Sequence, residues 1–383
     1  MRMEAEQITA WGRLLPRLTR WGVSVERMTL ERVDALCSFF ERAYADQPVG
    51  AGFADGGRVL ERWRWLNEGN PSRLDHELPA WLCLKRGEIV GHFGVLPAIA
   101  VCRRQTIPIC WGRDLIVAPE ARRQGIGPIL IITAVMAARR PLLIAGLNDA
   151  VYSIYRRLGF LDLGAIPLYL RIYQPQRLLD TLPWPGLARR TAVLAVAAAQ
   201  RLMERLRRRR SSLSLVPLDR FDERFDSWWR RVEKSFPCVV RRTSATLNWR
   251  YHCHPFHRYT TVAATDGEGL RGILIVRRGY SRGLPAGFIS ELLADPNDHE
   301  AVEVLVTAAE ELLRSSAEEP LAFIRCTVYH RSFERMLARA GFLRAPSPIR
   351  WMSAHAEGSS ALGPLARRDG WFLNGGDSDL DML

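Results

Sequence analysis

The chain consists of two halves that resemble each other, and this internal repeat restricts its possible folds more than any other feature. Four landmarks occur in the first half: Trp63-Arg64-Trp65, Asn70-Pro71, Asp114 to Pro119, and Arg157 to Phe160. The second half has four counterparts in the same order: Trp249-Arg250-Tyr251, His254-Pro255, Glu291 to Pro296, and Arg339 to Phe342. Strand-like and helix-like patterns alternate between the landmarks in both halves. The repeat therefore predicts two related domains of the α/β class, each with a sheet flanked by helices.

Changes in composition along the chain suggest where these domains begin and end. The predicted parts are an N-terminal helical extension (1–23), a first domain (24–175), a basic helical linker (176–217), a second domain (218–355) and a C-terminal tail (356–383). Within the linker, Ala192 to Leu206 has an apolar body followed by a basic run. This pattern favours a helix packed between the domains, and it leaves open a peripheral contact with an anionic membrane face.

The chain is strongly basic, with 54 lysine and arginine residues against 41 acidic ones. Arginine accounts for nearly all of this charge, because lysine occurs only at Lys85 and Lys234. The charge favours an anionic ligand or surface, but no basic stretch is interleaved with aromatic residues, so we expect no nucleic-acid partner. No apolar run reaches the roughly 20 residues that cross a bilayer, and the N-terminus is unlike a signal peptide. We therefore expect a cytoplasmic protein.

A strand, a loop with two glycines and a helix follow one another between residues 115 and 139. Pro119 ends the apolar strand because it has no N–H to donate to a neighbouring strand. Gly125 and Gly127 allow backbone N–H groups to approach a ligand closely. The helix that we expect from Pro128 offers unsatisfied donors and a partial positive charge at its start. Such a loop is suited to hold a pyrophosphate.

A second motif follows on the next predicted helix. Asn148 and Tyr155 are seven residues apart, so both are expected on one face of that helix. The segment Arg156 to Phe160 contains a glycine that ends the helix before the next strand.

Together these two motifs resemble the signature of the GNAT superfamily of N-acyltransferases, over residues 111 to 160. The matching residues are Arg122, Gly125, Gly127, Asn148, Tyr155 and Gly159-Phe160. The resemblance implies a mixed, mostly antiparallel central sheet in each domain. It also implies an N-acyltransferase that uses an acyl-CoA, most simply acetyl-CoA, as its cosubstrate and transfers the acyl group directly to an amine.

The resemblance further implies a role for individual residues. Tyr155 would protonate the departing thiolate, because a phenol is neutral at pH 7 and can hydrogen-bond sulfur. A backbone N–H at Ile116 or Val117 would stabilise the oxyanion. Asp114 is either the base that takes the amine proton, directly or through a water, or a structural residue that pairs with Arg113 or caps the strand. The residues expected to contact coenzyme A are Ile116, Val117, Arg122, Arg123, Gln124, Gly125, Ile126, Gly127, Pro128 and Asn148.

The second half departs from this signature. In place of the glycine loop it has Asp298 to Glu303, whose carboxylates would repel a pyrophosphate, and Phe333 stands roughly in the place of Tyr155. We therefore expect residues 218–355 to form a degenerate GNAT-like domain that shapes the acceptor site or stabilises the first domain.

Two further clusters leave alternatives open. His252 to His257 combines three histidines with a cysteine, but adjacent ligands rarely converge on one ion, so a loop is favoured and no metal is expected. In the tail, Asp377, Asp379 and Asp381 alternate along the chain. They could bind an amine or a metal from one face of a strand, or belong to a disordered acidic terminus.

The acceptor is the least defined part of the prediction. The positive charge and the linker suit a small molecule or glycan precursor, such as an amino sugar. Two other classes stay open: a non-catalytic binding protein that keeps the GNAT fold, and a Fem-like transferase that takes an aminoacyl group from tRNA. The intact glycine loop disfavours the second. The oligomeric state is not indicated by the sequence.

Overall fold

The computed structural model describes residues 22–44, 56–73, 79–181, 191, 193–196, 198–199, 211–315 and 319–378. The chain divides into two compact units. Unit 1 comprises Met1–Ala165, Pro348–Asp369 and Ser378–Leu383, and unit 2 comprises Ile166–Ser347 and Gly370–Asp377. Each unit is thus assembled from separate stretches of the chain, whereas the sequence predicted continuous domains that end at 175 and 355.

Two predicted segments lie largely outside the described residues, namely the N-terminal extension at 1–23 and the linker helix Ala192 to Leu206. The membrane contact expected of this linker stays a prediction. In the part of the chain that the structure describes, no helix is both long enough and apolar enough to span a bilayer.

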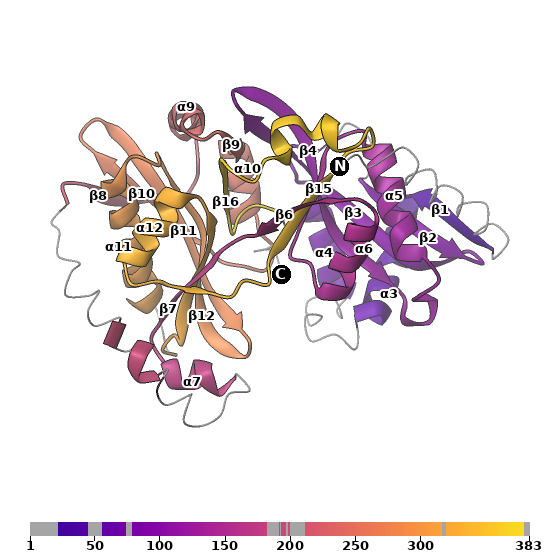
Figure 1. The fold of residues 1–383 in the computed structure, drawn as a ribbon, viewed down its shortest axis with the longest axis horizontal. Coiled ribbons are helices and arrows are strands. Elements are labelled where there is room, and N and C mark those ends of the chain that lie inside the picture. The colour runs from indigo at the N-terminus through magenta and orange to yellow at the C-terminus, as the bar shows by residue number, and fades with distance from the viewer. Residues whose placement is uncertain are drawn as a thin grey trace. The chain divides into compact units, whose positions relative to one another are not determined.

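Unit 1 contains a mixed sheet flanked by helices (Figure 1). Its strands, in spatial order, are β1 (Val23–Arg27), β2 (Ala80–Lys85), β3 (Glu88–Cys102), β4 (Gln105–Val117), β5 (Leu142–Ala145), β15 (Arg350–Ala354) and β6 (Leu161–Ala165). Neighbouring strands are antiparallel except β4 and β5, which are parallel. Its helices are α3 (Val33–Tyr44), α4 (Gly56–Asn67), α5 (Ile126–Ala138) and α6 (Asp149–Arg157), with short 3₁₀ segments at Leu30–Arg32, Pro119–Ala121 and Ser359–Ala366.

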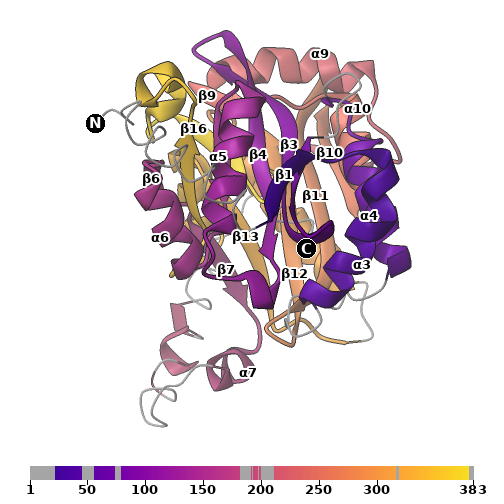
Figure 2. The ribbon, with the colours of Figure 1, turned by 90° about the vertical axis from the view of Figure 1, so that its right-hand side faces the viewer.

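Two adjacent residues of β3 show which helices cover which face of this sheet. A Cβ added to Gly91 would touch Ile126 of α5. The next side chain, His92, lies edge-on to Phe40 of α3, with 4.9 Å between ring centroids. Because successive strand residues point to opposite faces, α5 covers one face, and α3 with α4 beside it covers the other (Figure 2). Burial of apolar side chains from both faces forms the core of the unit.

Unit 2 contains a second mixed sheet flanked by helices. Its strands, in spatial order, are β8 (Ser214–Pro217), β10 (Thr260–Asp266), β11 (Gly269–Ser281), β12 (Leu284–Ala294), β13 (Phe323–Tyr329), β7 (Leu168–Ile172) and β14 (Leu343–Ala345). Only β12 and β13 are parallel in this series. β16 (Trp371–Asn374) pairs with β13 and, in parallel, with β9 (Cys238–Val240). The helices are α7 (Pro175–Asp180), α9 (Glu223–Val232), α10 (Ser244–Leu247), α11 (His299–Ser315) and α12 (Arg331–Arg339), with a 3₁₀ segment at Glu233–Ser235 and a π-helical segment at Asn248–His252.

The two sheets have the same strand order, and each takes one strand from the other half of the chain. β15, from the C-terminal part, lies between β5 and β6 of unit 1. β7, from the N-terminal half, lies between β13 and β14 of unit 2. The colours of Figure 1 make this visible, because each of these strands differs in colour from its neighbours. The predicted α/β class with mostly antiparallel sheets is confirmed, but the exchange of strands was not predicted.

Candidate functional site

The central feature of unit 1 is an opening between β4 and β5. These parallel strands pair only at Cys110 with Leu142 and at Trp111 with Leu143. Beyond these pairs β4 continues to Val117. Among the described residues, no other strand pairs with the edge of β4 that faces β5. A stretch of β4 backbone is therefore available to a ligand along this edge.

A bulge in β4 lies at the start of this opening. Gly94 of β3 pairs with Arg113 and His92 pairs with Ile116, so β4 has one more residue than β3 between these two pairs. Asp114 sits at this place with φ of 51°, a left-handed conformation that aspartate adopts more readily than most residues. An extra residue of this kind reverses which backbone groups face which edge of the strand.

The hydrogen bonding beyond the bulge shows which N–H groups face the opening. The N–H of Ala118 donates to Val90 O on β3, at 2.9 Å. Because the N–H groups of a strand alternate between its two edges, the N–H of Ile116 points toward β3 and that of Val117 toward the opening. Of the two residues that the sequence analysis offered for the oxyanion, the geometry therefore favours Val117.

The start of α5 lies just beyond the end of β4 and has the form expected of an anion site. Gly125 is the N-cap residue of α5, with φ of 80° and no side chain to occupy the first-turn N–H groups. A Cβ added to Gly125 would meet nothing within 4 Å. At Gly127 an added Cβ would meet only Val117 Cγ2, at 3.9 Å. The helix start is thus open, and its dipole favours a negative charge there.

Side chains hold this loop in place. Arg122 Nε donates to Val117 O at 3.2 Å, which joins the loop to the end of β4. Gln124 Nε2 donates to Glu120 O at 3.0 Å, and Lys85 Nζ of β2 donates to Gln124 Oε1 at 3.2 Å. Lys85 was not among the predicted site residues. It adds a positive charge beside the loop, where Arg122 and Arg123 are exposed.

Tyr155 lies on α6, the helix that follows β5, and is 1% exposed. Its ring packs edge-on against Phe160, with centroids 4.7 Å apart. Asn148 lies just before α6 rather than on its face, since it is the N-cap residue and its Oδ1 accepts from Val151 N at 2.9 Å. The prediction that Asn148 lies on the helix itself is therefore wrong, because asparagine is preferred at N-cap positions, where it satisfies a first-turn N–H.

Both carboxylate oxygens of Asp114 are held by arginines. Arg62 of α4 donates Nη1 to Oδ2 at 2.9 Å and Nη2 to Oδ1 at 3.2 Å, and Arg113 donates Nη1 to Oδ2 at 2.7 Å. These side chains are between 2% and 7% exposed. Burial alone would raise the pKa of Asp114, but the two guanidinium groups outweigh it and hold the pKa well below its usual range. A carboxylate held in this way is a weak proton acceptor.

His92 contacts the same bulge from β3. Its Nδ1 lies 2.8 Å from Asp114 O, so Nδ1 carries the hydrogen and Nε2 is left as an acceptor. Among the described residues, His92 Nε2 has no hydrogen-bond partner. Burial lowers the pKa of His92 to about 4, and Arg113 and Arg62 act in the same direction. The histidine is therefore neutral at pH 7. It was not predicted from the sequence, because no local sequence pattern surrounds it.

The corresponding places in unit 2 are built differently. Asp298 precedes α11, and its Oδ1 accepts from Ala301 N at 3.1 Å, so a carboxylate occupies the helix start that Gly125 leaves open in unit 1. Phe333 of α12 is fully buried and lacks the hydroxyl group of tyrosine.

The two remaining clusters of the sequence analysis also have defined structures. In the His252 to His257 loop, His254 Nδ1 accepts from the backbone N–H groups of Phe256 and His257, both at 3.1 Å. No group of three possible metal ligands occurs among the described residues. In the tail, Asp377 is buried and pairs with Arg242 at 2.9 Å, while Asp379 and Asp381 lie outside the described residues.

Comparison with known proteins connects this architecture to one family. Residues 77–161 match the family model of the acetyltransferase (GNAT) domain. A comparison with curated proteins finds none that matches this chain.

Solved structures share the fold over most of the chain. A GCN5-related N-acetyltransferase from Anabaena variabilis is 13% identical and aligns over 87% of this chain and 73% of its own, with a TM-score of 0.58. An N-myristoyltransferase from Saccharomyces cerevisiae, solved with bound myristoyl-CoA, is 11% identical over 87% and 79%, with a TM-score of 0.55. A GCN5-related N-acetyltransferase from Kribbella flavida is 14% identical over 88% and 72%, with a TM-score of 0.52. Residues 77–161 therefore match the GNAT acetyltransferase domain, and the fold of the chain is the one that these transferases share.

Proposed function

We propose that the chain is an acyl-CoA-dependent N-acyltransferase that moves an acyl group directly from the thioester to an amine. The observation that carries this proposal is the opening between β4 and β5, which leads to the uncapped start of α5. The similarity of the fold to acetyl- and myristoyltransferases supports it.

Each part of an acyl-CoA finds a suitable place in this arrangement. The pyrophosphate would accept hydrogen bonds from the first-turn N–H groups of α5, with Arg122, Arg123 and Lys85 adding positive charge. The amides of the pantetheine arm would pair with the free edge of β4. The thioester carbonyl oxygen would then accept a hydrogen bond from the N–H of Val117, which points into the opening. The negative charge that develops on this oxygen during the reaction would lie beside a fixed donor.

The proton transfers are divided between two places. Tyr155 is proposed to protonate the departing thiolate, since its phenol needs no charged partner to do so. For Asp114, the double ion pair opposes the role of base. We propose instead that Asp114 fixes the bulge that turns the N–H of Val117 toward the opening.

For the acceptor, we propose a small molecule or glycan precursor that carries an amine, such as an amino sugar. The basic composition of the chain supports an acceptor with a negatively charged part, for example a sugar linked to a nucleotide. The acyl group is most simply acetyl.

The proposal is tested first by ligand binding. Acetyl-CoA and longer acyl-CoA species should raise the melting temperature of the protein, because a ligand that binds only the folded state stabilises it, by about 2.7 kcal/mol at a hundredfold excess over the dissociation constant. Gly127→Glu should abolish the rise, because it brings a carboxylate to the helix start where the phosphates would lie. Gly127→Ala is the matched control and should keep the rise, because its Cβ meets only one ordinary contact at 3.9 Å.

Turnover is tested next, by following free thiol release from acetyl-CoA with a panel of amines. Absence of any thermal shift with every acyl-CoA contradicts the proposal as a whole. A shift without turnover on any amine supports the alternative of a binding protein that keeps the fold.

A further inference from the structure

The opening of unit 2 that corresponds to the one between β4 and β5 contains a strand. β12 and β13 pair from Ala286 with Phe323 to Ile289 with Cys326, and then separate. Beyond that point, Val328 and Tyr329 of β13 pair with Asn374 and Leu373 of β16. The N–H of Val328 donates to Pro167 O next to β7, at 3.3 Å. β16 therefore lies along the other edge of β13, which is the edge that β12 has left.

The turn after β16 packs closely on β12. A Cβ added to Gly375 would lie 3.3 Å from Ser290 O, and one added to Gly376 would overlap Glu291 Oε1 and Tyr251 Oη. Only glycine fits at position 376, because a Cβ there would displace Glu291 Oε1 and Tyr251 Oη, which form a buried hydrogen bond of 2.9 Å with each other. The C-terminal segment is thus fitted to the bulge of β12 at residue 290.

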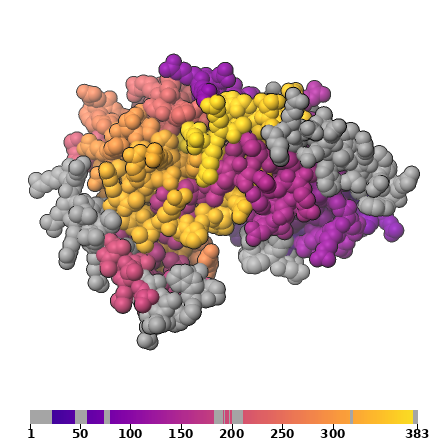
Figure 3. Space-filling model, viewed as in Figure 1, coloured from indigo at the N-terminus to yellow at the C-terminus, as the bar shows by residue number. Residues whose placement is uncertain are grey.

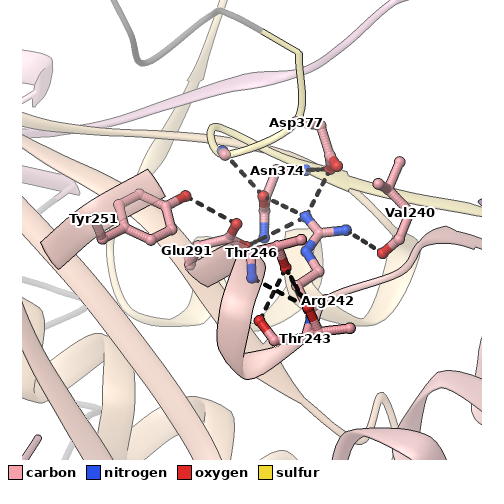
Figure 4. A network of polar contacts seen from close by, with 9 residues as sticks. Val240, Arg242, Thr243, Thr246, Tyr251, Glu291, Asn374 and Asp377 are labelled. Carbon is pink, nitrogen blue, oxygen red and sulfur yellow. Dashed lines mark hydrogen bonds and ion pairs between the residues drawn. The ribbon is translucent and has the colours of Figure 1, made fainter. Parts of the chain in front are cut away.

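Polar contacts fix this turn inside the unit (Figure 4). Asn374 Nδ2 donates to Glu291 Oε2 at 2.5 Å. Arg242 Nη2 donates to Asp377 Oδ2 at 2.9 Å and to Asn374 Oδ1 at 3.0 Å, and it lies 3.3 Å from Glu291 Oε2. Burial raises the pKa of Glu291, and Arg242 counters this effect. The ion-paired side chains are between 1% and 4% exposed. Arg242 therefore pairs with two carboxylates, and one of these, Asp377, belongs to the C-terminal segment.

An apolar anchor lies on the strand itself. Phe372 is fully buried, and its ring centroid is 4.5 Å from that of Phe236 and 4.9 Å from that of Phe333. Phe333 is the residue that stands in the place of Tyr155. The surface of the molecule shows much of the C-terminal part of the chain in yellow (Figure 3), but all four residues of β16 are buried.

We propose that the opening between β12 and β13 is a strand-binding groove, and that its ligand is the chain's own segment Trp371–Asp377. The groove supplies backbone pairing along β13, a pocket of phenylalanines for Phe372, and the Arg242–Glu291 pair for the polar turn. The segment binds as a peptide would, by β-strand addition, so its covalent link to the rest of the chain is not required. This inference does not depend on acyl transfer by unit 1.

The test separates the segment from the chain after folding is complete. A recognition sequence for a site-specific protease is inserted between Arg368 and Asp369, where the chain is exposed. After cleavage of the folded protein, the C-terminal fragment should elute with the main chain in size-exclusion chromatography at micromolar concentration. A labelled peptide with the sequence of residues 369–383 should exchange with the bound C-terminal fragment. Fluorescence anisotropy of this peptide then gives its dissociation constant from the cleaved main chain.

Two glycine variants of this cleavable protein make the test specific. Gly376→Ala should weaken retention of the fragment by at least about tenfold, because the added methyl group overlaps the Glu291–Tyr251 hydrogen bond. Gly267→Ala is the matched control and should retain the fragment as the parent does, because its Cβ would meet nothing within 4 Å. A fragment that separates from the cleaved parent on the column overturns the proposal. So does equal retention in the Gly376→Ala variant and the parent.

Discussion

Tyr155 and Tyr152 offer a direct test of the acid at the level of single atoms. Tyr155→Phe removes one oxygen from a side chain that is 1% exposed and should lower kcat by about 100-fold while KM for acyl-CoA stays unchanged, since general acid catalysis contributes factors of this order. Tyr152→Phe is the matched control on the same helix. It loses a hydrogen bond of 2.5 Å to Asp162 and should keep its kcat. Equal activity of both variants on every amine tested would remove Tyr155 from the mechanism.

His92 makes the stability of unit 1 sensitive to acid. Its folded-state pKa of about 4 lies below the unfolded value of 6.5, so the unfolded chain binds more protons as the pH falls through this window. Stability should therefore decline between pH 6.5 and 4, by up to about 3 kcal/mol from this residue. The stabilising effect of Asp114 is lost only at still lower pH, because its pKa is lowered from 3.8.

Denaturant unfolding of the parent and His92→Gln at pH 7 and pH 4.5 measures this effect. The variant should lose less stability than the parent on acidification. His330 of unit 2 has a pKa lowered to about 4 by burial as well, so His92→Gln should remove only part of the acid sensitivity. Identical pH dependence in both proteins would contradict the assignment.

The site residues proposed from the sequence are those that lie in two short local motifs. Gly125 and Gly127 belong to the first motif and Tyr155 to the second, and their proposed roles follow from the resemblance to the GNAT signature. Arg62 was not predicted, because it meets Asp114 across 52 positions of the chain. Sequence does not give such a pairing, which depends on how α4 packs on the sheet.

At the scale of elements, the bulge in β4 depends on the ion pairs around Asp114. Asp114→Asn leaves Arg62 and Arg113 buried without their counter-charge and should lower the free energy of unfolding by about 3 kcal/mol. Glu26→Gln is the control, because it breaks a pair with Arg32 whose side chains are 46% and 38% exposed, and should cost less than about 1 kcal/mol. Urea unfolding of both variants gives these values.

The same variant separates two roles for Asp114. If the residue only fixes the bulge, activity per folded molecule in Asp114→Asn should fall together with stability and with acyl-CoA affinity. Full stability combined with loss of turnover would instead assign Asp114 as the base.

The elements themselves were predictable in kind but not in partnership. The strand ending at Val117 and the helix after Gly125 follow from apolar runs bounded by Pro119 and the glycines. β7 and β15 are short strands, and nothing in their residues identifies the sheet that they join. Because backbone hydrogen bonds are the same for every sequence, the internal repeat could not show that these strands are exchanged.

At the scale of the whole molecule, we expect unit 1 to bind an acyl-CoA and unit 2 not to bind one. Isothermal titration calorimetry should give one acyl-CoA bound per chain, and Gly127→Glu should abolish it. Unit 2 is expected to contribute none, because Asp298 caps α11 with a carboxylate and β16 fills the opening beside β13. A stoichiometry of two would show that the second unit also binds the cofactor.

The exchange of β7 and β15 also governs how the protein can be made. β15 (Arg350–Ala354) is translated long after β5 (Leu142–Ala145) and β6 (Leu161–Ala165), so the ribosome synthesises the whole segment between β6 and β15 before the first sheet can close. Until then, two strand edges of the nascent chain stay open to pairing with other chains. A gene fragment that keeps only residues 77–161 would leave that sheet permanently incomplete. Domain shuffling in evolution would have to move both halves together, because neither can be inherited as a finished fold.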